Sequence, residues 1–329
     1  MNIRTSATFF AAALALFILP HAASAQVAHP FTWDGGSLVD SNWSTKENWV
    51  GDVVITETSS FDRDVIFGGS NRLTPIFNSS AFGSLSGGFN LRGITFDATA
   101  AAFTLTETAS AGLDMLGDRN TATTSNIVNN STNLQTISLK LFIRQDFTSG
   151  LNFNTASGDI SVTTGMVQSG TGAVIKTGAA TLLLSGANVY TGPTTITGGS
   201  VTVSGSGRLG SGQTSLASTA ITLAISTGAT DAIPNAATLS LAGGGTLDVA
   251  DAGFLTLGTG VNESVATLIL GGTPMTPGTY GAVGSGAGFQ SNEFFSGSGV
   301  LTVTAPEPGS ALTLVAGIGL LLRRSRQAR

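Results

Sequence analysis

The sequence predicts an all-β fold made of many short strands. Stretches such as GITFDA, TLLLSG and ATLILGG alternate Thr or Ser with apolar residues, which places one set of side chains in a buried interior and the other in water. The 44 glycines separate such stretches and allow tight turns between them. Few helix signals lie between residues 26 and 305.

A recurring motif indicates how these strands are arranged. The pattern L-x-L-x-G begins at Leu182, Leu239 and Leu268, and the related L-x-L-G begins at Leu255. Strand units of similar size are typical of a β-solenoid, in which each coil contacts only its neighbours. The stretch NNSTNLQTISLKL over 129–141 indicates a polar Asn/Thr ladder beside a strand, with a structural role. A β-sandwich is the alternative that composition alone leaves open.

The N-terminus predicts a secretory signal peptide over residues 1–25. Arg4 precedes an apolar run over 7–19, and the A-x-A site that ends at Ala25 places cleavage before Gln26. The alternative is an uncleaved anchor, but the run is too short to span a bilayer. We therefore expect export through the general secretory pathway. The exported chain contains no cysteine, so its stability depends on burial and backbone hydrogen bonds.

The charge of the exported chain argues against nucleic acid as a partner. Residues 26–305 carry nine basic and eighteen acidic side chains, and no Lys or Arg occurs between Leu209 and Leu322. Phosphate binding requires cations, whereas broad acidity favours solubility.

We predict no catalytic residue. There is no cysteine nucleophile, and the single histidine of the exported chain, His29, lies close to its new N-terminus. Asp62 and Asp64 are two residues apart on one strand face and form a candidate glycosidase pair, with Arg63 on the opposite face. Because they also fit a solvated strand edge or turn, we predict that role instead.

A second carboxylate pair, Asp248 and Asp251, is interpreted in the same way. We predict no metal and no cofactor. The sequence contains neither a calcium-loop pattern nor a histidine cluster. GSGRLG at 205–210 fits a dinucleotide-loop spacing but precedes no helix, so it predicts a turn between coils.

All three tryptophans lie in one short segment, at Trp33, Trp43 and Trp49. Aromatic faces stack on sugars, which makes the three residues candidate glycan contacts. The favoured interpretation is an aromatic cap that covers the first coil and blocks edge pairing.

The segment KTGAATLLLSGANVYTGPTTITGGSV resembles the autotransporter-associated β-strand repeat. The likeness is close over Lys176–Gly199 and includes Asn188. It departs at Ala180 and Pro193, where glycine is more usual. The resemblance implies a right-handed parallel β-helix or a β-solenoid-like coil.

Two further segments are similar to the regions that flank such repeats. Residues 33–52 resemble the W-D-G…W-S…N-W module that precedes them, and residues 272–303 resemble their closing segment. We therefore divide the exported chain into an N-terminal β region with a tryptophan-rich cap over 26–165 and a repeat region over 166–305.

The C-terminal tail over 306–329 resembles a PEP-CTERM sorting signal, which implies processing by an exosortase-type enzyme in the membrane. Its apolar run over 311–322 predicts a short helix of roughly 18 Å, against about 30 Å of hydrocarbon. A plain tail anchor is the alternative. The residues assigned to the signal are Pro306, Glu307, Pro308, Arg323 and Arg324.

We therefore expect a secreted, non-enzymatic cell-surface protein with a structural or adhesive role. Its transient partners would be signal peptidase and the sorting enzyme, with membrane contact through the tail before processing. Its lasting partner would be exopolysaccharide or another surface glycan. The alternatives are a carbohydrate-binding module centred on the tryptophans and a β-helix polysaccharide lyase or hydrolase.

Overall fold

The computed structural model describes most of the chain between residues 29 and 304. The described residues are 29–53, 55, 63–78, 89–108, 112–115, 124–144, 150–169, 172–216, 221–243 and 254–304. Several predictions of the sequence therefore fall outside them: the signal peptide with Ala25 and Gln26, the carboxylates Asp62, Asp248 and Asp251, and the whole sorting tail with its short helix.

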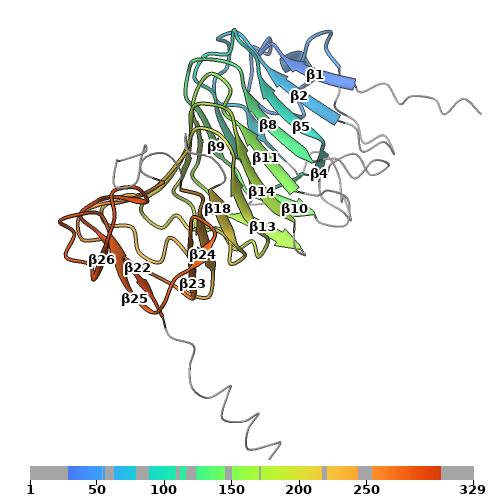
Figure 1. Ribbon diagram of the computed structural model, residues 1–329. Helices are drawn as coiled ribbons and strands as arrows, with labels where there is room; N and C mark the ends of the chain where they lie inside the picture. Colours follow the sequence, from blue (N-terminus) through green and yellow to red (C-terminus); the bar gives the residue numbers. More distant parts are fainter. Residues whose placement is uncertain are drawn as a thin grey trace, which may run out of the picture.

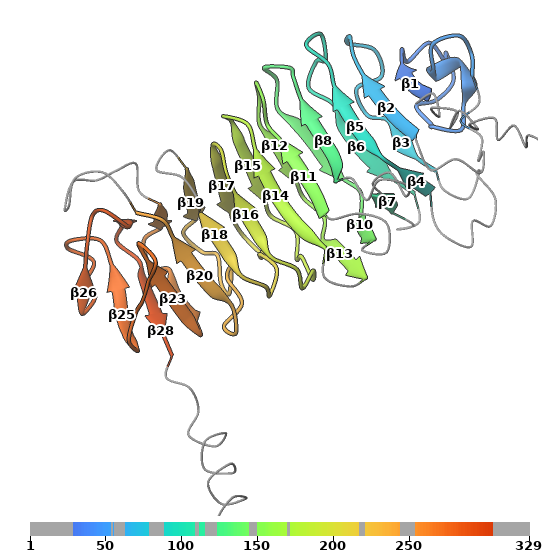
Figure 2. The ribbon, with the colours of Figure 1, turned by 45° about the vertical axis from the view of Figure 1, so that its right-hand side comes forward.

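The described strands wind around one axis and stack into four sheets (Figures 1 and 2). Sheet A contains, in spatial order, β1 (His29–Trp33), β2 (Arg63–Phe67), β5 (Gly93–Phe96), β8 (Ser125–Asn129), β11 (Gly150–Asn154), β14 (Ala173–Thr177), β16 (Thr194–Ile196), β18 (Thr214–Leu216), β20 (Thr238–Leu241), β23 (Thr267–Leu270) and β24 (Thr273–Pro274). Sheet B contains β27 (Phe295–Gly297), β21 (Leu255–Leu257), β19 (Thr222–Ile225), β17 (Ser200–Val203), β15 (Thr181–Leu184), β12 (Ile160–Val162), β9 (Gln135–Ser138), β6 (Thr104–Glu107) and β3 (Ile76–Phe77).

Two shorter sheets complete the molecule. Sheet C contains β13 (Met166–Ser169), β10 (Leu141–Arg144), β7 (Leu113–Met115) and β4 (Phe89–Leu91). Sheet D lies at the C-terminal end and contains β22 (Asn262–Val265), β28 (Val300–Val303), β25 (Gly278–Gly281) and β26 (Phe289–Gln290). One 3₁₀ turn, Lys46–Asn48, stands among the described strands.

The pairing is that of a parallel β-solenoid. In sheet A every pair from β1 to β23 is parallel, and each strand pairs with the corresponding strand of the next coil. Sheet B repeats this pattern. The predicted solenoid-like all-β fold is confirmed, and the sandwich alternative is wrong because a sandwich is built from antiparallel sheets.

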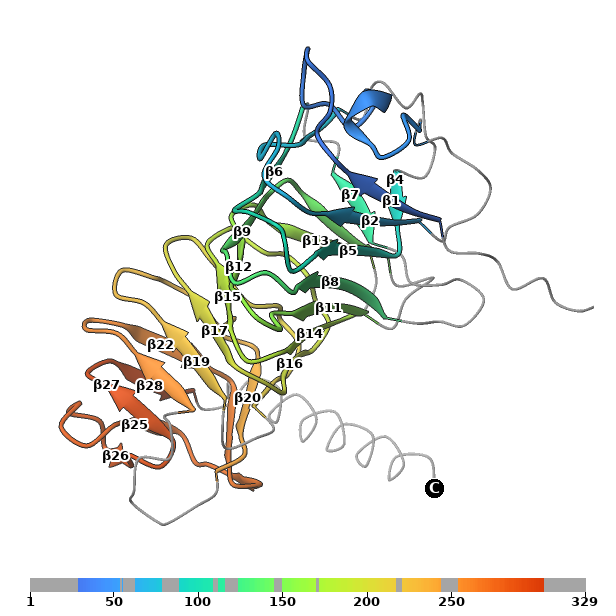
Figure 3. The ribbon, with the colours of Figure 1, turned by 90° about the horizontal axis from the view of Figure 1, so that it is seen from above.

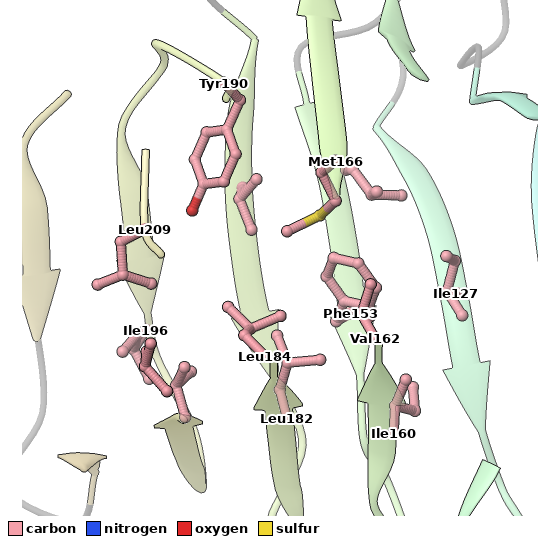
Figure 4. Close-up of a cluster of buried hydrophobic side chains, with 14 of the residues drawn as sticks. Ile127, Phe153, Ile160, Val162, Met166, Leu182, Leu184, Tyr190, Ile196 and Leu209 are labelled. Carbon is pink, nitrogen blue, oxygen red and sulfur yellow. The ribbon is translucent and has the colours of Figure 1, made fainter. Parts of the chain in front are cut away.

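Register aligns the inward side chains into rows that run along the axis (Figure 4). The alternation of apolar and polar residues produces these rows, since every second side chain of each strand faces the interior. One row of sheet A consists of Val65, Ile94, Ile127, Phe153, Lys176, Ile196, Leu216, Leu241 and Leu270. All of its members except Lys176 are apolar.

The cross-section changes along the axis. The coils that begin with β2, β5, β8 and β11 contribute strands to sheets A, B and C, whereas the coils that begin with β14, β16 and β18 contribute to sheets A and B alone. The coils are shortest in the repeat region: successive sheet A strands start at Gly93 and Ser125 early in the stack, at Thr194 and Thr214 in the repeat region, and at Thr238 and Thr267 near the C-terminal end. Figure 3 shows the coils from above.

No helix among the described residues is long and apolar enough to cross a membrane.

Candidate binding surface

The tryptophan segment packs inside the first coil. Trp33, Trp43 and Trp49 are 1%, 0% and 0% exposed. The rings of Trp33 and Trp49 meet edge to face with centroids 5.1 Å apart, and the indole nitrogen of Trp49 donates to the Trp43 carbonyl oxygen at 2.8 Å. Since none of the three presents a ring face to solvent, stacking on a sugar would require this cluster to open. The three indole rings therefore belong to the buried core of the first coil.

An open groove of about 500 Å³ lies on the outer face of sheet A, near its N-terminal end. Strands β1, β2, β5 and β8 form its floor, so it crosses four consecutive strands of one rigid sheet. Its lining consists of Pro30, Asp64, Ile66, Arg92, Gly93, Thr95, Thr124, Asn126 and Val128. A volume of this size is within the range of small-molecule sites in proteins.

An ion pair spans the groove. The Nε of Arg92 donates to Oδ1 of Asp64 at 3.2 Å, and an Nη of the same guanidinium donates to Oδ2. Both side chains remain partly exposed. The strand register explains this placement, because Asp64 lies opposite Gly93, the residue after Arg92. The pair neutralises its own charge, which favours uncharged, hydroxyl-bearing ligands over strongly charged ones.

A row of hydrogen-bonded polar side chains runs along sheet A from the edge of the groove. Asn126 and Asn152 are register partners on β8 and β11, and Nδ2 of Asn152 donates to Oδ1 of Asn126 at 3.0 Å. The hydroxyl of Thr177 donates to Oδ1 of Asn152 at 3.0 Å. This outward row lies on β8, β11 and β14. The Asn/Thr ladder expected over 129–141 is a separate feature, in which Nδ2 of Asn133 donates to the Ala100 carbonyl oxygen of the preceding coil at 2.9 Å. Amides supply both donors and acceptors, as recognition of sugar hydroxyls requires.

Gly93 keeps the floor of the groove open. A Cβ at this position would lie 2.9 Å from Oδ1 of Asp64 and 3.3 Å from the Asn126 carbonyl oxygen. Any side chain here would therefore displace the carboxylate that pairs with Arg92.

The expected opposite orientation of Arg63 and Asp64 is observed. Arg63 is buried, with its guanidinium 5.2 Å from the centre of the Phe89 ring, whereas Asp64 faces the groove. Sequence reasoning named Asp64 but missed Arg92 and Asn126, because these residues come together only through strand pairing. No group of three or more His, Asp or Glu side chains that could hold a metal occurs within the described parts of the chain.

The repeat segment holds a buried cation. Lys176 is fully buried, and its Nζ donates to the carbonyl oxygens of Thr177, Gly178 and Gly198 at 2.8, 3.0 and 2.9 Å. Burial lowers the pKa of Lys176 to about 8, because desolvation disfavours the charged amine; the carboxylate of Asp159 acts in the opposite direction. The role of Lys176 is to join the turns of two coils.

A buried amide joins coils on the side where sheet C ends. Oδ1 of Asn188 accepts from the backbone N–H of Met166 at 2.8 Å, and its Nδ2 donates to the Arg208 carbonyl oxygen at 2.6 Å. The adjacent hydroxyl of Tyr190 lies 2.8 Å from that of Thr194, and burial raises the pKa of this tyrosine. Asn188 thus bridges three successive coils where no strand does so.

A family model matches the part of the chain that contains Lys176 and Asn188. The family model described as Passenger-associated-transport-repeat matches residues 174–203, which span β14 to β17. No curated protein and no solved structure matches the chain. The match confirms the resemblance to the autotransporter-associated repeat. It indicates an exported, surface-associated protein of the passenger type and favours a structural role over an enzymatic one.

Proposed function

We propose that this chain is a structural or adhesive protein of the cell surface, displayed in association with the envelope or exopolysaccharide and delivered there by its PEP-CTERM tail. The observation that carries the proposal is the passenger-type repeat at 174–203, which forms consecutive coils of one uninterrupted solenoid. Such a stack is rigid along its axis and presents the outer faces of its sheets to its surroundings.

The groove on sheet A supports a glycan as the adhesive ligand. Its carboxylate, guanidinium, amide and threonine hydroxyls offer the donors and acceptors that sugar hydroxyls use. Its lining residues include no aromatic ring, so affinity would come from hydrogen bonds in a shallow site. Each contact would be weak, and retention on a long polysaccharide would depend on many displayed copies.

Sorting by the PEP-CTERM tail is tested by measuring where the native protein ends and where it fractionates. We expect its intact mass to lack residues beyond about Pro308, and the protein to fractionate with the envelope or the medium. A chain that keeps Arg329 and remains in the inner membrane would instead establish a tail anchor, and sorting by the PEP-CTERM signal would be abandoned.

Glycan binding in the groove is tested by a matched pair of substitutions on the outer face of sheet A. Thr95 lines the groove, whereas Thr195 lies outside it; both are partly buried and face outward. We expect Thr95→Arg to reduce retention on the exopolysaccharide of the producing cells at least tenfold, because the long side chain fills the groove. Thr195→Arg should retain full binding. If both variants are retained equally on the exopolysaccharide, the groove is not the glycan site.

The lyase or hydrolase alternative is tested on the same material. It requires turnover of the polysaccharide, seen as new chain ends, and loss of that turnover in Asp64→Asn. We expect no new chain ends with the unaltered protein. Their appearance would replace the structural role by an enzymatic one.

A further inference from the structure

Exposed apolar side chains gather at the two ends of the solenoid. Large apolar residues with high exposure among the described residues are Leu38, Val39, Val50, Val53, Leu134, Val189, Val283 and Phe289. The first four belong to the segment around β1, and the last two to the segment that leads into β26; these lie at opposite ends of the stack in Figures 1 and 2. Terminal coils of solenoids normally have polar outer surfaces, so this distribution is unusual.

The loop that carries Leu38 and Val39 is rigidly built. The Ser37 hydroxyl accepts from the backbone N–H groups of Val39 and Asp40, at 3.1 and 3.3 Å. The Arg72 Nε donates to the Ser37 carbonyl oxygen at 2.5 Å. At its tip Leu38 is 97% and Val39 88% exposed. The N-terminal end therefore presents two adjacent apolar side chains on a backbone that hydrogen bonds already hold in place.

The loop at the other end is built in a similar way. The backbone N–H of Val283 donates to Oδ1 of Asn292 at 3.0 Å, and that of Gly284 donates to Oε1 of Gln290 at 2.8 Å. Val283 in this loop is 65% exposed, and Phe289, the first residue of β26, is 39% exposed. The C-terminal end thus also offers apolar side chains on a preorganised surface.

The two ends of sheet A do not favour strand addition. At the C-terminal end sheet A finishes in β24, which is antiparallel and contains Pro274, a residue without a backbone N–H. At the N-terminal end Trp49 pairs with Trp33, and the Val50 N–H donates to the Thr32 carbonyl oxygen at 2.8 Å. A partner that meets either end of sheet A therefore binds through side chains and not by extending that sheet.

We propose that copies of this chain associate end to end, with the apolar loop at Leu38 and Val39 of one molecule packing against the loop of Val283 and Phe289 of the next. A second copy fits both surfaces because the two apolar loops lie at opposite ends of one axis, and each supplies the apolar partner that the other lacks. The two loops differ, so the contact is heterologous and repeats into an open filament. Because the side chains that meet in this contact are apolar, added salt should not weaken it.

The test uses the protein purified from its native source, as processed there, and follows its sedimentation and electron-microscope images over a range of concentrations. We expect linear oligomers that lengthen with concentration. The double variant Leu38→Asp with Val39→Asp should be monomeric, and so should Val283→Asp. The control is Val189→Asp, which places a charge at an equally exposed apolar position on the flank and should leave the oligomers unchanged.

A mixing experiment separates end-to-end contact from general stickiness. The N-terminal double variant keeps an intact C-terminal loop, and Val283→Asp keeps an intact N-terminal loop. The mixture should therefore form dimers and nothing longer. Circular dichroism and thermal unfolding report the fold of each variant, and the gentler Leu38→Ser replaces the double variant if that one misfolds.

Four results would each overturn the proposal. These are a monomeric unaltered protein, equal disruption of the oligomers by Val189→Asp, failure of the two end variants to pair when mixed, and binding of the ends to lipid vesicles without self-association.

Discussion

The Nζ of Lys176 lies 2.9 Å from the carbonyl oxygen of Gly198, in the turn of the next coil, and donates a hydrogen bond to it. The same amine holds the carbonyl oxygens of Thr177 and Gly178 in its own turn. Lys176 occupies a row of otherwise apolar side chains, between Phe153 and Ile196. Lys176, the first residue of the repeat motif, therefore joins the turns of two neighbouring coils from inside the solenoid.

Replacement of Lys176 by Met should destabilise the protein at neutral pH by roughly 1–3 kcal/mol. Three buried carbonyl oxygens lose their donor, which outweighs the relief from burying one charge. The measurement is denaturant unfolding followed by circular dichroism. Ile196→Met, in the same row one coil later, is the control and should cost under about 1.5 kcal/mol, because it loses no hydrogen bond. A Lys176→Met protein as stable as the unaltered one would mean that the three bonds add nothing net.

The stability of the unaltered protein should rise as the pH increases above about 8. The pKa of Lys176 is about 8 in the folded state and 10.5 in its ordinary environment, so between these values the unfolded chain binds more protons. The free energy of unfolding then increases with pH, by on the order of 2 kcal/mol up to about pH 9.5. Above that range the raised pKa of Tyr190 acts in the opposite direction. Urea unfolding at several pH values measures the slope, which should vanish in Lys176→Met; a slope that persists there would assign it to another group.

The strands could be predicted from the sequence because alternation of apolar and polar residues survives in every coil. TLLL at 181–184 forms β15, with Leu182 and Leu184 inside. The corners could not be predicted in the same way. The stretch ISLKLFI divides into β9 and β10, yet burial continues to alternate through Leu139 between them. Alternation therefore marks the inward face but does not show where the chain turns.

The candidate sites were harder to predict than the strands. A lysine in a polar sequence indicates a surface position, and only the register of β14 with its neighbours shows that Lys176 points inward. Asp64 and Arg92 are 28 residues apart and meet through the pairing of β2 with the following coil. Contacts between coils depend on coil length, which no local pattern in this chain specifies.

Asn188→Asp should destabilise the protein by about 2–4 kcal/mol at neutral pH. The carboxylate can still accept from the Met166 N–H but cannot donate to the Arg208 carbonyl oxygen, and it buries an uncompensated charge. The loss should diminish in acid, since a protonated carboxyl regains a donor. Thermal unfolding at neutral and acidic pH measures both effects. Asn235→Asp, at an exposed position, serves as the control and should change stability little. A destabilisation that is independent of pH would contradict the donor role.

Gly199→Ala should cost roughly 3 kcal/mol, whereas Gly205→Ala should cost about 1 kcal/mol. Both glycines have left-handed backbones, with φ of +61° and +56°, so alanine introduces similar strain at each. The difference lies in packing between coils. A Cβ at Gly199 would lie 2.3 Å from the Ala180 carbonyl oxygen, while one at Gly205 would meet nothing within 4 Å. Because the obstructing atom belongs to the backbone of the preceding coil, the clash cannot be relieved by a rotamer change. Equilibrium unfolding of the two variants measures the gap directly. Equal losses would show that backbone strain alone, and not the close approach of the coils, requires glycine at the end of the repeat motif.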